Sequence, residues 1–252
     1  MTNKTNTVIN NKALSSISIV LTVAVIIVVL LGSVVFYFWF VPGNLKTEKM
    51  NFTDFNSVDV GWAFDLTLNQ GNSYSVAITA DEKIFDLIEV TQTENKLSIG
   101  FKDGTMPGNL FRKAEITMPE LDELILTGAS KGVIDGYSSS TQIYLELSGA
   151  SSLDTSDLEV HDIEIEVSGA SSLTSEGTGN NISAIVSGAS KIDLSKLSLN
   201  DADMQVTGAS KVTINIDGRL DAQVSGASTL EYLGEPTLGE INTSGVSTIR
   251  KK

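Results

Sequence analysis

The chain of 252 residues contains no cysteine and a single histidine. Without cysteine the fold cannot depend on disulfide bonds, and the chain cannot carry the lipid-modified cysteine of a lipoprotein. Basic residues are also scarce, because 17 Lys and Arg stand against 31 Asp and Glu, a formal net charge of −14. Phosphate contacts require a basic binding face, so this balance argues against nucleic acid and anionic lipid as partners.

Charged residues are missing altogether from one long segment, residues 17–41. As an α-helix its 25 residues would span roughly 37 Å at about 1.5 Å per residue, enough to cross a bilayer with some tilt. The run is too long for a cleaved signal peptide, and five aromatic residues at 36–40 occupy its end, where an interfacial belt is expected. We therefore expect a transmembrane signal anchor at 17–41, with a buried core helix as the alternative.

The charges around this run predict its orientation. Residues 1–16 hold two lysines and no acid, whereas all 31 acidic residues follow the run. This asymmetry favours a short cytoplasmic tail at 1–16, a linker at 42–50 and a C-terminal domain outside the cell membrane, extracellular or periplasmic.

A four-residue phrase, Ser/Thr-Gly-Ala-Ser with one Val variant, occurs seven times between Thr127 and Ser247. Successive glycines lie 21, 20, 19, 20, 18 and 19 residues apart, which is the period of a solenoid. The glycine and final serine of each copy are the repeat positions, namely Gly128, Ser130, Gly149, Ser151, Gly169, Ser171, Gly188, Ser190, Gly208, Ser210, Gly226, Ser228, Gly245 and Ser247.

Apolar and polar residues alternate on both sides of each phrase. Before the third copy, Ile163, Ile165 and Val167 alternate with two glutamates, the period of two expected for a half-buried strand. No helix-length apolar stripe occurs in the repeats, so helical and leucine-rich repeats fit poorly. The sequence predicts an all-β fold, a parallel β-helix or β-solenoid of about seven coils over 119–252.

Two further expectations follow from this fold. Residues 51–118 carry looser strand signals and would form an N-terminal cap region of the solenoid or a run of irregular coils. The small residues of the phrase would occupy stacked corners, where backbones approach closely. If the alternation continues through the corner, the repeat serines face inward and form hydrogen bonds along the stack.

Several segments together resemble a known family. They are NFTDFNSV at 51–58, FDLTL at 64–68, MPELDEL at 118–124 leading into the first phrase, and the recurrent Ser-Gly-Ala-Ser. Over about residues 51–250 the chain resembles the auto-transporter adhesin head domain, or head GIN domain, a domain of unknown function in bacterial and archaeal surface proteins. The resemblance implies a right-handed parallel β-helix exported to the cell surface, and it brings no catalytic residues.

One segment matches a catalytic pattern. Residues 128–132 read G-x-S-x-G, the nucleophile elbow of hydrolases, but the segment is one of seven near-identical corners and the chain has only His161 as a partner. We predict no catalytic residue and no cofactor.

The position four residues before each phrase is a carboxylate in five of seven copies. Stacked coils would align these side chains about 4.8 Å apart on an outer face, where like charges repel. Calcium accepts flexible shells of carboxylate oxygens, which makes Glu164, Asp203 and Asp221 candidate ligands. A solvated acidic face without metal is the alternative, and the one that we favour.

Lysine follows the phrase directly in three copies, as Lys131, Lys191 and Lys211. These side chains form a possible ligand face for an acidic glycan. They serve equally well as surface charges that maintain solubility, the interpretation that we prefer.

We therefore predict a membrane-anchored, non-enzymatic adhesion module, attached by one N-terminal helix, that contacts a glycan, a cell-wall polymer or a surface protein. A solenoid offers an extended surface without a deep pocket, which suits adhesion. One alternative is a polysaccharide lyase or glycoside hydrolase, but coils of 18–21 residues leave little chain for the walls of a cleft. Another is the ligand-sensing ectodomain of an envelope signalling system.

Overall fold

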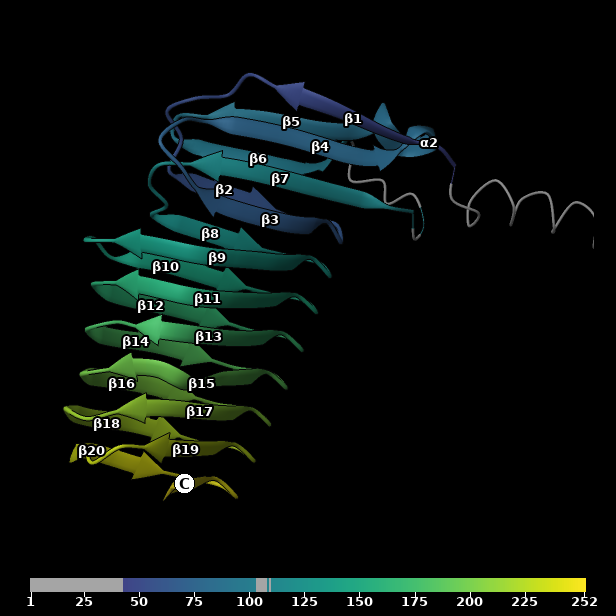
Figure 1. Ribbon diagram of the computed structural model, residues 1–252. Helices are drawn as coiled ribbons and strands as arrows, with labels where there is room; N and C mark the ends of the chain where they lie inside the picture. The colour runs from purple at the N-terminus through teal and green to yellow at the C-terminus, as the bar shows by residue number, and fades with distance from the viewer. Residues whose placement is uncertain (1–42, 103–107, 109) are drawn as a thin grey trace, which may run out of the picture. The chain divides into compact units, whose positions relative to one another are not determined.

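The computed structural model describes residues 43–102, 108 and 110–252 (Figure 1). Of these, residues 44–102 and 111–252 belong to one compact unit. The predicted tail at 1–16 and the predicted transmembrane anchor at 17–41 lie outside the described residues. No helix within the described ranges is long and apolar enough to cross a membrane.

The described chain is mostly β-strand, with a single four-residue helix, α2 (Glu82–Phe85), among the described residues. The strands form two sheets. Sheet A contains, in spatial order, β1 (Leu45–Met50), β4 (Ser75–Asp81), β7 (Arg112–Met118), β3 (Asp65–Gln70), β9 (Lys131–Ser139), β11 (Ser152–Val160), β13 (Ser172–Thr178), β15 (Lys191–Leu199), β17 (Lys211–Ile216), β19 (Thr229–Leu233) and β21 (Thr248–Lys251). Sheet B contains β20 (Thr237–Thr243), β18 (Arg219–Val224), β16 (Asp201–Val206), β14 (Asn181–Val186), β12 (Asp162–Val167), β10 (Ile143–Leu147), β8 (Glu123–Leu126), β2 (Ser57–Val60), β6 (Lys96–Phe101) and β5 (Ile88–Thr93).

From β8 onward the chain alternates between the two sheets, and each strand pairs in parallel with the strand one coil away. Figure 1 shows these coils stacked in sequence order, from teal to yellow. The prediction of an all-β solenoid is confirmed. It has about six turns, where about seven coils were expected from the sequence.

The core lies between the two sheets and is made by the inward positions of the strands. In β12, Ile163, Ile165 and Val167 are at most 2% exposed, and each lies in register with an apolar residue of both neighbouring coils. Burying a side chain of this size contributes roughly 1.5–3 kcal/mol. The period-two pattern of the sequence is therefore the pattern of the core.

The N-terminal part of the unit is a different arrangement of the same two sheets. β2 and β3 form a coil that pairs in parallel with β8 and β9 on one side and with β6 and β7 on the other. β4 and β5 add to these in antiparallel orientation, and β1 pairs antiparallel with β4 at the edge. Residues 45–50, which the sequence analysis places in a linker, are this edge strand.

The seven corners share one backbone conformation. Their glycines all have a φ between +74° and +82°, a region that L-residues rarely adopt. Each of the six later corners also hydrogen-bonds to the preceding one, as where Ala189 N–H donates to the carbonyl oxygen of Gly169 at 2.7 Å. A Cβ atom on Gly188 would lie 2.2 Å from that same oxygen. Only glycine fits the position, for both reasons.

The coil of β2 and β3 has an eighth corner, whose residues do not match the repeated phrase. Strand register places Gly61, Trp62, Ala63 and Phe64 where the first repeat corner has Thr127, Gly128, Ala129 and Ser130. Trp62 takes the glycine position and has a φ of +61°. Phe64 takes the serine position and is fully buried.

Candidate functional site

The repeat serines lie at the inner side of the corners. Those of the first six copies are at most 2% exposed. Their hydroxyls join neighbouring coils, since Ser171 Oγ accepts from Ser151 N–H at 3.3 Å and Ser228 Oγ accepts from Ser210 N–H at 3.2 Å. Ser247, in the last copy, donates from Oγ to the Val224 carbonyl at 2.8 Å. These serines connect coils and face away from any ligand.

The G-x-S-x-G match has no catalytic geometry. Its serine, Ser130, is fully buried, whereas His161 is 59% exposed at its side chain and pairs with Asp162 at 3.2 Å. A nucleophile must reach both its base and its substrate. A fully buried Ser130 cannot reach a substrate in solution.

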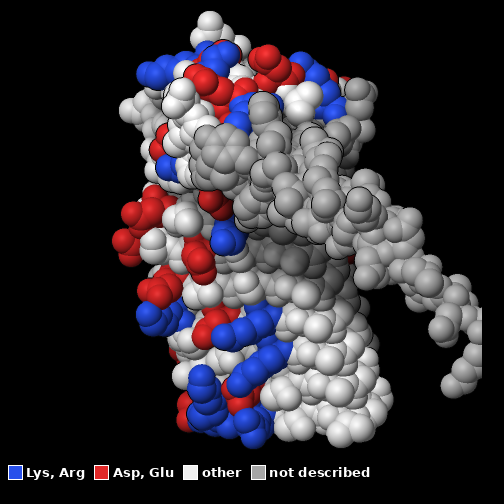
Figure 2. Space-filling view, turned by 90° about the vertical axis from the view of Figure 1, so that its right-hand side faces the viewer, with Lys and Arg blue, Asp and Glu red and all other residues white. Residues whose placement is uncertain are grey.

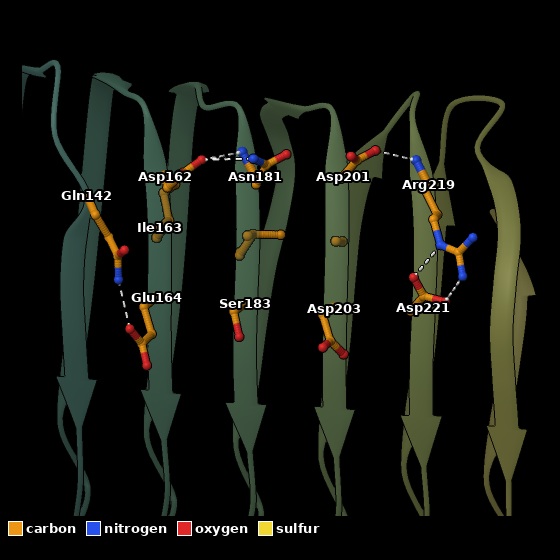
Figure 3. Close-up of a pocket in the computed structure, with 12 residues that line it drawn as sticks. Gln142, Asp162, Ile163, Glu164, Asn181, Ser183, Asp201, Asp203, Arg219 and Asp221 are labelled. Atoms are coloured by element: carbon orange, nitrogen blue, oxygen red, sulfur yellow. Dashed lines mark hydrogen bonds and ion pairs between the residues drawn. The ribbon is translucent and has the colours of Figure 1, made fainter.

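The candidate calcium ligands lie on the outer face of sheet B, in a groove of about 470 Å³ across β12, β14, β16 and β18 (Figure 3). Glu164, Ser183, Asp203 and Asp221 form one row through the strand register. Ser183 separates Glu164 from Asp203 by two coils, which amounts to about 9–10 Å at the usual strand spacing. Asp203 and Asp221 are direct neighbours in the row.

A second row of polar side chains lies beside this one, and sequence reasoning missed it. Asn181 donates from Nδ2 to Asp162 Oδ1 at 3.0 Å. Arg219 donates from its backbone N–H to Asp201 Oδ1 at 2.7 Å and from Nε to Asp221 Oδ2 at 2.6 Å. These contacts are among the dashed lines in Figure 3. The row lies two residues before the acidic row, so the same period of two could have found it.

Arg219 changes the chemistry of the acidic row. Its guanidinium contacts both carboxylate oxygens of Asp221, and Glu240 N–H donates to the same carboxylate. The hydrogen bonds from Arg219, followed by that from Glu240, lower the pKa of Asp221 to about 2. Throughout the described part of the chain, no group of three or more His, Asp and Glu side chains is placed to hold a metal ion. Glu164, Asp203 and Asp221 therefore do not converge on one point.

The predicted lysine face is divided between two places. Lys191 and Lys211 are direct neighbours in the strand register, whereas Ser152 and Ser172 stand between Lys131 and Lys191. The sequence grouped the three lysines by their position in the repeat, but the two coils with serine at that position separate Lys131 from the others.

Lys191 and Lys211 belong to a larger basic cluster, defined here as Lys191, Lys211, Arg250 and Lys252. Glu231 lies beneath it with a side chain only 6% exposed, and receives hydrogen bonds from Arg250 Nε at 3.0 Å and an ion pair from Lys211 Nζ at 3.3 Å. Hydrogen bonds from Arg250 and Lys211 lower the pKa of Glu231. Ser195 lowers the pKa of Asp193 most, with smaller contributions from the charges of Lys252 and Lys191.

Figure 2 looks onto the side of the solenoid where the corners lie. Lys and Arg side chains gather in the lower part of this view, beside an uncharged band. The band agrees with the exposed Gly and Ala residues of the repeat corners. A positive cluster next to an uncharged surface is unusual in a chain with a net charge of −14.

The sequence model of the family described as "Putative auto-transporter adhesin, head GIN domain" matches residues 54–236. The chain belongs to this family. The resemblance seen in the sequence is thereby confirmed, and the family description suggests a cell-surface protein. No curated protein matches the chain.

Solved structures share the fold. A putative adhesin from Bacteroides fragilis has a TM-score of 0.71 at 21% identity, covering 83% of this chain and 97% of its own. A putative lipid binding protein from Parabacteroides distasonis has a TM-score of 0.65 at 16% identity, covering 83% and 97%. A putative adhesin from Parabacteroides merdae has a TM-score of 0.64 at 16% identity, covering 83% and 98%. At these identities the likeness concerns the fold alone.

Proposed function

We propose that this head GIN domain protein is a non-enzymatic adhesion module, held at the cell membrane by a single N-terminal span with its solenoid outside, which binds an acidic surface polymer through the basic cluster. The observation that carries the proposal is the direct register of Lys191 with Lys211. Two cations one coil apart, about 4.8 Å, match an extended polymer with regularly spaced negative charges.

The residues around the cluster support this assignment. Glu231 pairs with Lys211 and Arg250 from below, and the charges of Lys191 and Lys252 act on Asp193. Lys191 and Lys211 keep exposed side chains. Two carboxylates under four cations leave an excess of positive charge. On a chain that is acidic overall, such a local field would steer a negatively charged polymer to this one surface.

The acidic groove supports the non-enzymatic part of the proposal. A glycoside hydrolase needs one carboxylic acid with a raised pKa to protonate the leaving group. The pKa of Asp221 is instead lowered to about 2 by Arg219, so this carboxylate stays ionised and cannot donate a proton near neutral pH.

The uncharged run at 17–41 and the charge asymmetry around it support the membrane anchor. The test is alkaline extraction of cell membranes followed by protease treatment of intact cells. The full chain should stay with the membrane fraction, and its solenoid should be cleaved from outside. Release by alkaline carbonate would contradict an integral anchor.

The adhesive function is tested by sedimenting the full chain with two insoluble polymers, cross-linked polygalacturonate and neutral cellulose, while reducing sugar is assayed in the supernatant. We expect saturable binding to polygalacturonate, little binding to cellulose and no sugar release. Lys191→Ala combined with Lys211→Ala should weaken binding at least tenfold. The matched control is Lys131→Ala combined with Lys196→Ala, which removes two lysines outside the cluster.

Two results would contradict the proposal. Equal loss of binding in the double variant and its control would mean that net charge, and not the cluster, is recognised. Release of reducing sugar that disappears on a single carboxylate substitution would make the protein an enzyme.

A further inference from the structure

The eighth corner places a large side chain where the other seven corners have glycine. Trp62 has a φ of +61° and the next residue, Ala63, a φ of +58°. Non-glycine residues in this left-handed region cost of order 1–3 kcal/mol each, and they persist mainly where the surrounding structure holds them for a purpose. Two in succession at a corner that elsewhere uses glycine call for an explanation.

The neighbouring coil explains why the side chain fits there. A repeat corner is stacked against the carbonyl oxygen of the preceding corner, but β6, the neighbour of β2, runs straight on through Gly100 to Phe101. The indole of Trp62 therefore lies over Gly100, since a Cβ atom on Gly100 would be 3.1 Å from Trp62 Cδ1. Trp62 is 38% exposed, so part of its surface faces solvent.

A hollow of about 240 Å³ lies beside this indole. Gly61 and Gly100 line it and present no side chains. Its polar groups come from four strands or their ends, and they are Asp59, Glu89, Thr91, Ser98 and Thr127. Asp59, Ser98 and Thr91 form a continuous row through the strand register.

The groups around the hollow have complementary chemistry. Two carboxylates accept hydrogen bonds, three hydroxyls donate or accept them, and the indole offers an apolar surface. Asp59 is partly buried, and this burial raises its pKa, while the charge of Lys96 lowers it. A single apolar surface with polar groups converging on it is the general form of a small-molecule site.

We propose that this hollow, the Trp62 pocket, binds one pyranose ring of a neutral glycan. The ring would place its C–H face against the indole and its hydroxyls toward Asp59, Glu89 and the three side-chain hydroxyls. Pockets for drug-sized ligands begin at about 300 Å³, so this smaller hollow suits one sugar ring. The two carboxylates disfavour an acidic sugar, and an acyl chain would leave these polar groups without partners.

The Trp62 pocket is separate from the basic cluster, so this inference goes beyond the proposed function. Its residues belong to β2, β5, β6 and the first two corners, whereas the cluster belongs to β15, β17 and the end of sheet A. A protein with both sites would bind a neutral sugar residue in the Trp62 pocket and an acidic polymer at the basic cluster.

The test is a fluorescence titration of the full chain carrying Trp39→Phe, which leaves Trp62 as the only tryptophan of the two in the sequence. The probes are the methyl pyranosides of glucose, galactose, mannose and N-acetylglucosamine, with choline as a cationic comparison. We expect a saturable change in Trp62 emission with at least one pyranoside and none with choline. Saturation-transfer NMR with the same probe then measures binding to variants that lack Trp62.

Three variants separate recognition from folding. Trp62→Gly installs the residue of the other corners, which tolerates the backbone conformation, so it should abolish pyranoside binding while the melting temperature stays within a few degrees. Asp59→Asn should weaken binding at least tenfold without removing the indole. Glu166→Gln, an exposed carboxylate elsewhere on sheet B, should bind like the wild type.

The proposal is overturned if no pyranoside gives a saturable change, if choline alone binds, or if Trp62→Gly keeps full pyranoside binding. Sedimentation of Trp62→Gly with polygalacturonate separates the two proposals. Loss of pyranoside binding with unchanged polymer binding supports the Trp62 pocket as a second site. Polymer binding that fails in the wild type, while pyranosides bind, removes only the proposed function.

Discussion

The eight corners of this solenoid occupy equivalent positions but differ in what lies next to them. Each of the six later repeat corners is stacked on another repeat corner, and a Cβ atom on its glycine would lie 2.2–2.6 Å from a carbonyl oxygen. Trp62 faces a strand that continues without turning. The comparison shows that a neighbouring corner leaves no room for a Cβ atom, so glycine is required there. A larger side chain fits where that neighbouring corner is absent.

The inner side of the corners shows the same contrast. In the repeats, buried serine hydroxyls connect one coil to the next. In the first coil Phe64 takes the serine position and packs on Phe101, with ring centroids 5.8 Å apart. Ser130, next in the stack, is the only repeat serine whose hydroxyl lacks a hydrogen-bond partner in the described part of the chain. At this boundary, aromatic packing replaces the hydrogen bonds that the serine hydroxyls make between coils.

Among the variants that test this comparison, substitutions of the corner glycines are expected to change stability most. Gly188→Ala combines a φ of +77° with a Cβ atom 2.2 Å from the Gly169 oxygen, and it should lower the free energy of unfolding by about 3 kcal/mol or more. In Gly128→Ala the nearest atom to the added Cβ is the Trp62 nitrogen, at 3.1 Å, and this variant should cost about half as much. Urea unfolding followed by circular dichroism measures both.

Gly136→Ala is the control for these two variants. Gly136 has a φ of +64° but no atom within 4 Å of the added Cβ, so this variant isolates the backbone cost, about 1 kcal/mol. Equal destabilisation in all three variants would show that the stacking of corners contributes nothing.

The serine positions give the next largest effect. Ser171→Ala removes the acceptor of the buried Ser151 N–H, and leaving such a group unsatisfied costs about 1–2 kcal/mol. Ser130→Ala removes a buried hydroxyl that has no partner within the described residues, so it should be neutral or slightly stabilising. Thermal unfolding of the pair compares them directly, and an equal loss in both would contradict the proposed role of the hydroxyls.

Acid should affect the far end of the stack, where Glu231 lies beneath Arg250 and Lys211. The folded state lowers the pKa of this carboxyl from 4.5, so the ion pairs stabilise the protein above that value, and this contribution is lost as the pH falls below it. The urea midpoint of the wild type should fall between pH 5 and pH 3, and Glu231→Gln should show a smaller fall. Glu159→Gln, an exposed carboxylate, should follow the wild type; if both variants behave alike, the buried ion pair has no special role.

The smallest effect is expected from an exposed ion pair on the regular coils. Lys196 Nζ lies 2.6 Å from Glu176 Oε1, with side chains 70% and 42% exposed. Solvent and salt screen exposed pairs, so Lys196→Ala should leave the unfolding free energy close to that of the wild type. A loss as large as that of Ser171→Ala would mean that surface charge stabilises these coils as much as their interior does.

The repeat made the regular part of the fold predictable. Alternation around Ile163 and Val167 gave the strands and the buried face, and the spacing of the glycines gave the stack. The corner of the first coil was not recognised as equivalent, because Gly61-Trp62-Ala63-Phe64 shares only its position in the coil with Thr-Gly-Ala-Ser, and that position depends on strand register. The sequence likewise grouped Lys131 with Lys191, because it shows each residue's place in the repeat and not which coils are adjacent.

The spatial order of the coils sets a sequence of events for folding. The coil of β2 and β3 lies between strands that follow it in the chain, β6 and β7 on one side and β8 and β9 on the other. Its paired residues are thus 39–66 positions away in the sequence, whereas each later coil adds to the one made 18–21 residues before. Long loops close more slowly than short ones, so we expect the N-terminal layers to limit the rate of nucleation and the repeats to elongate on them.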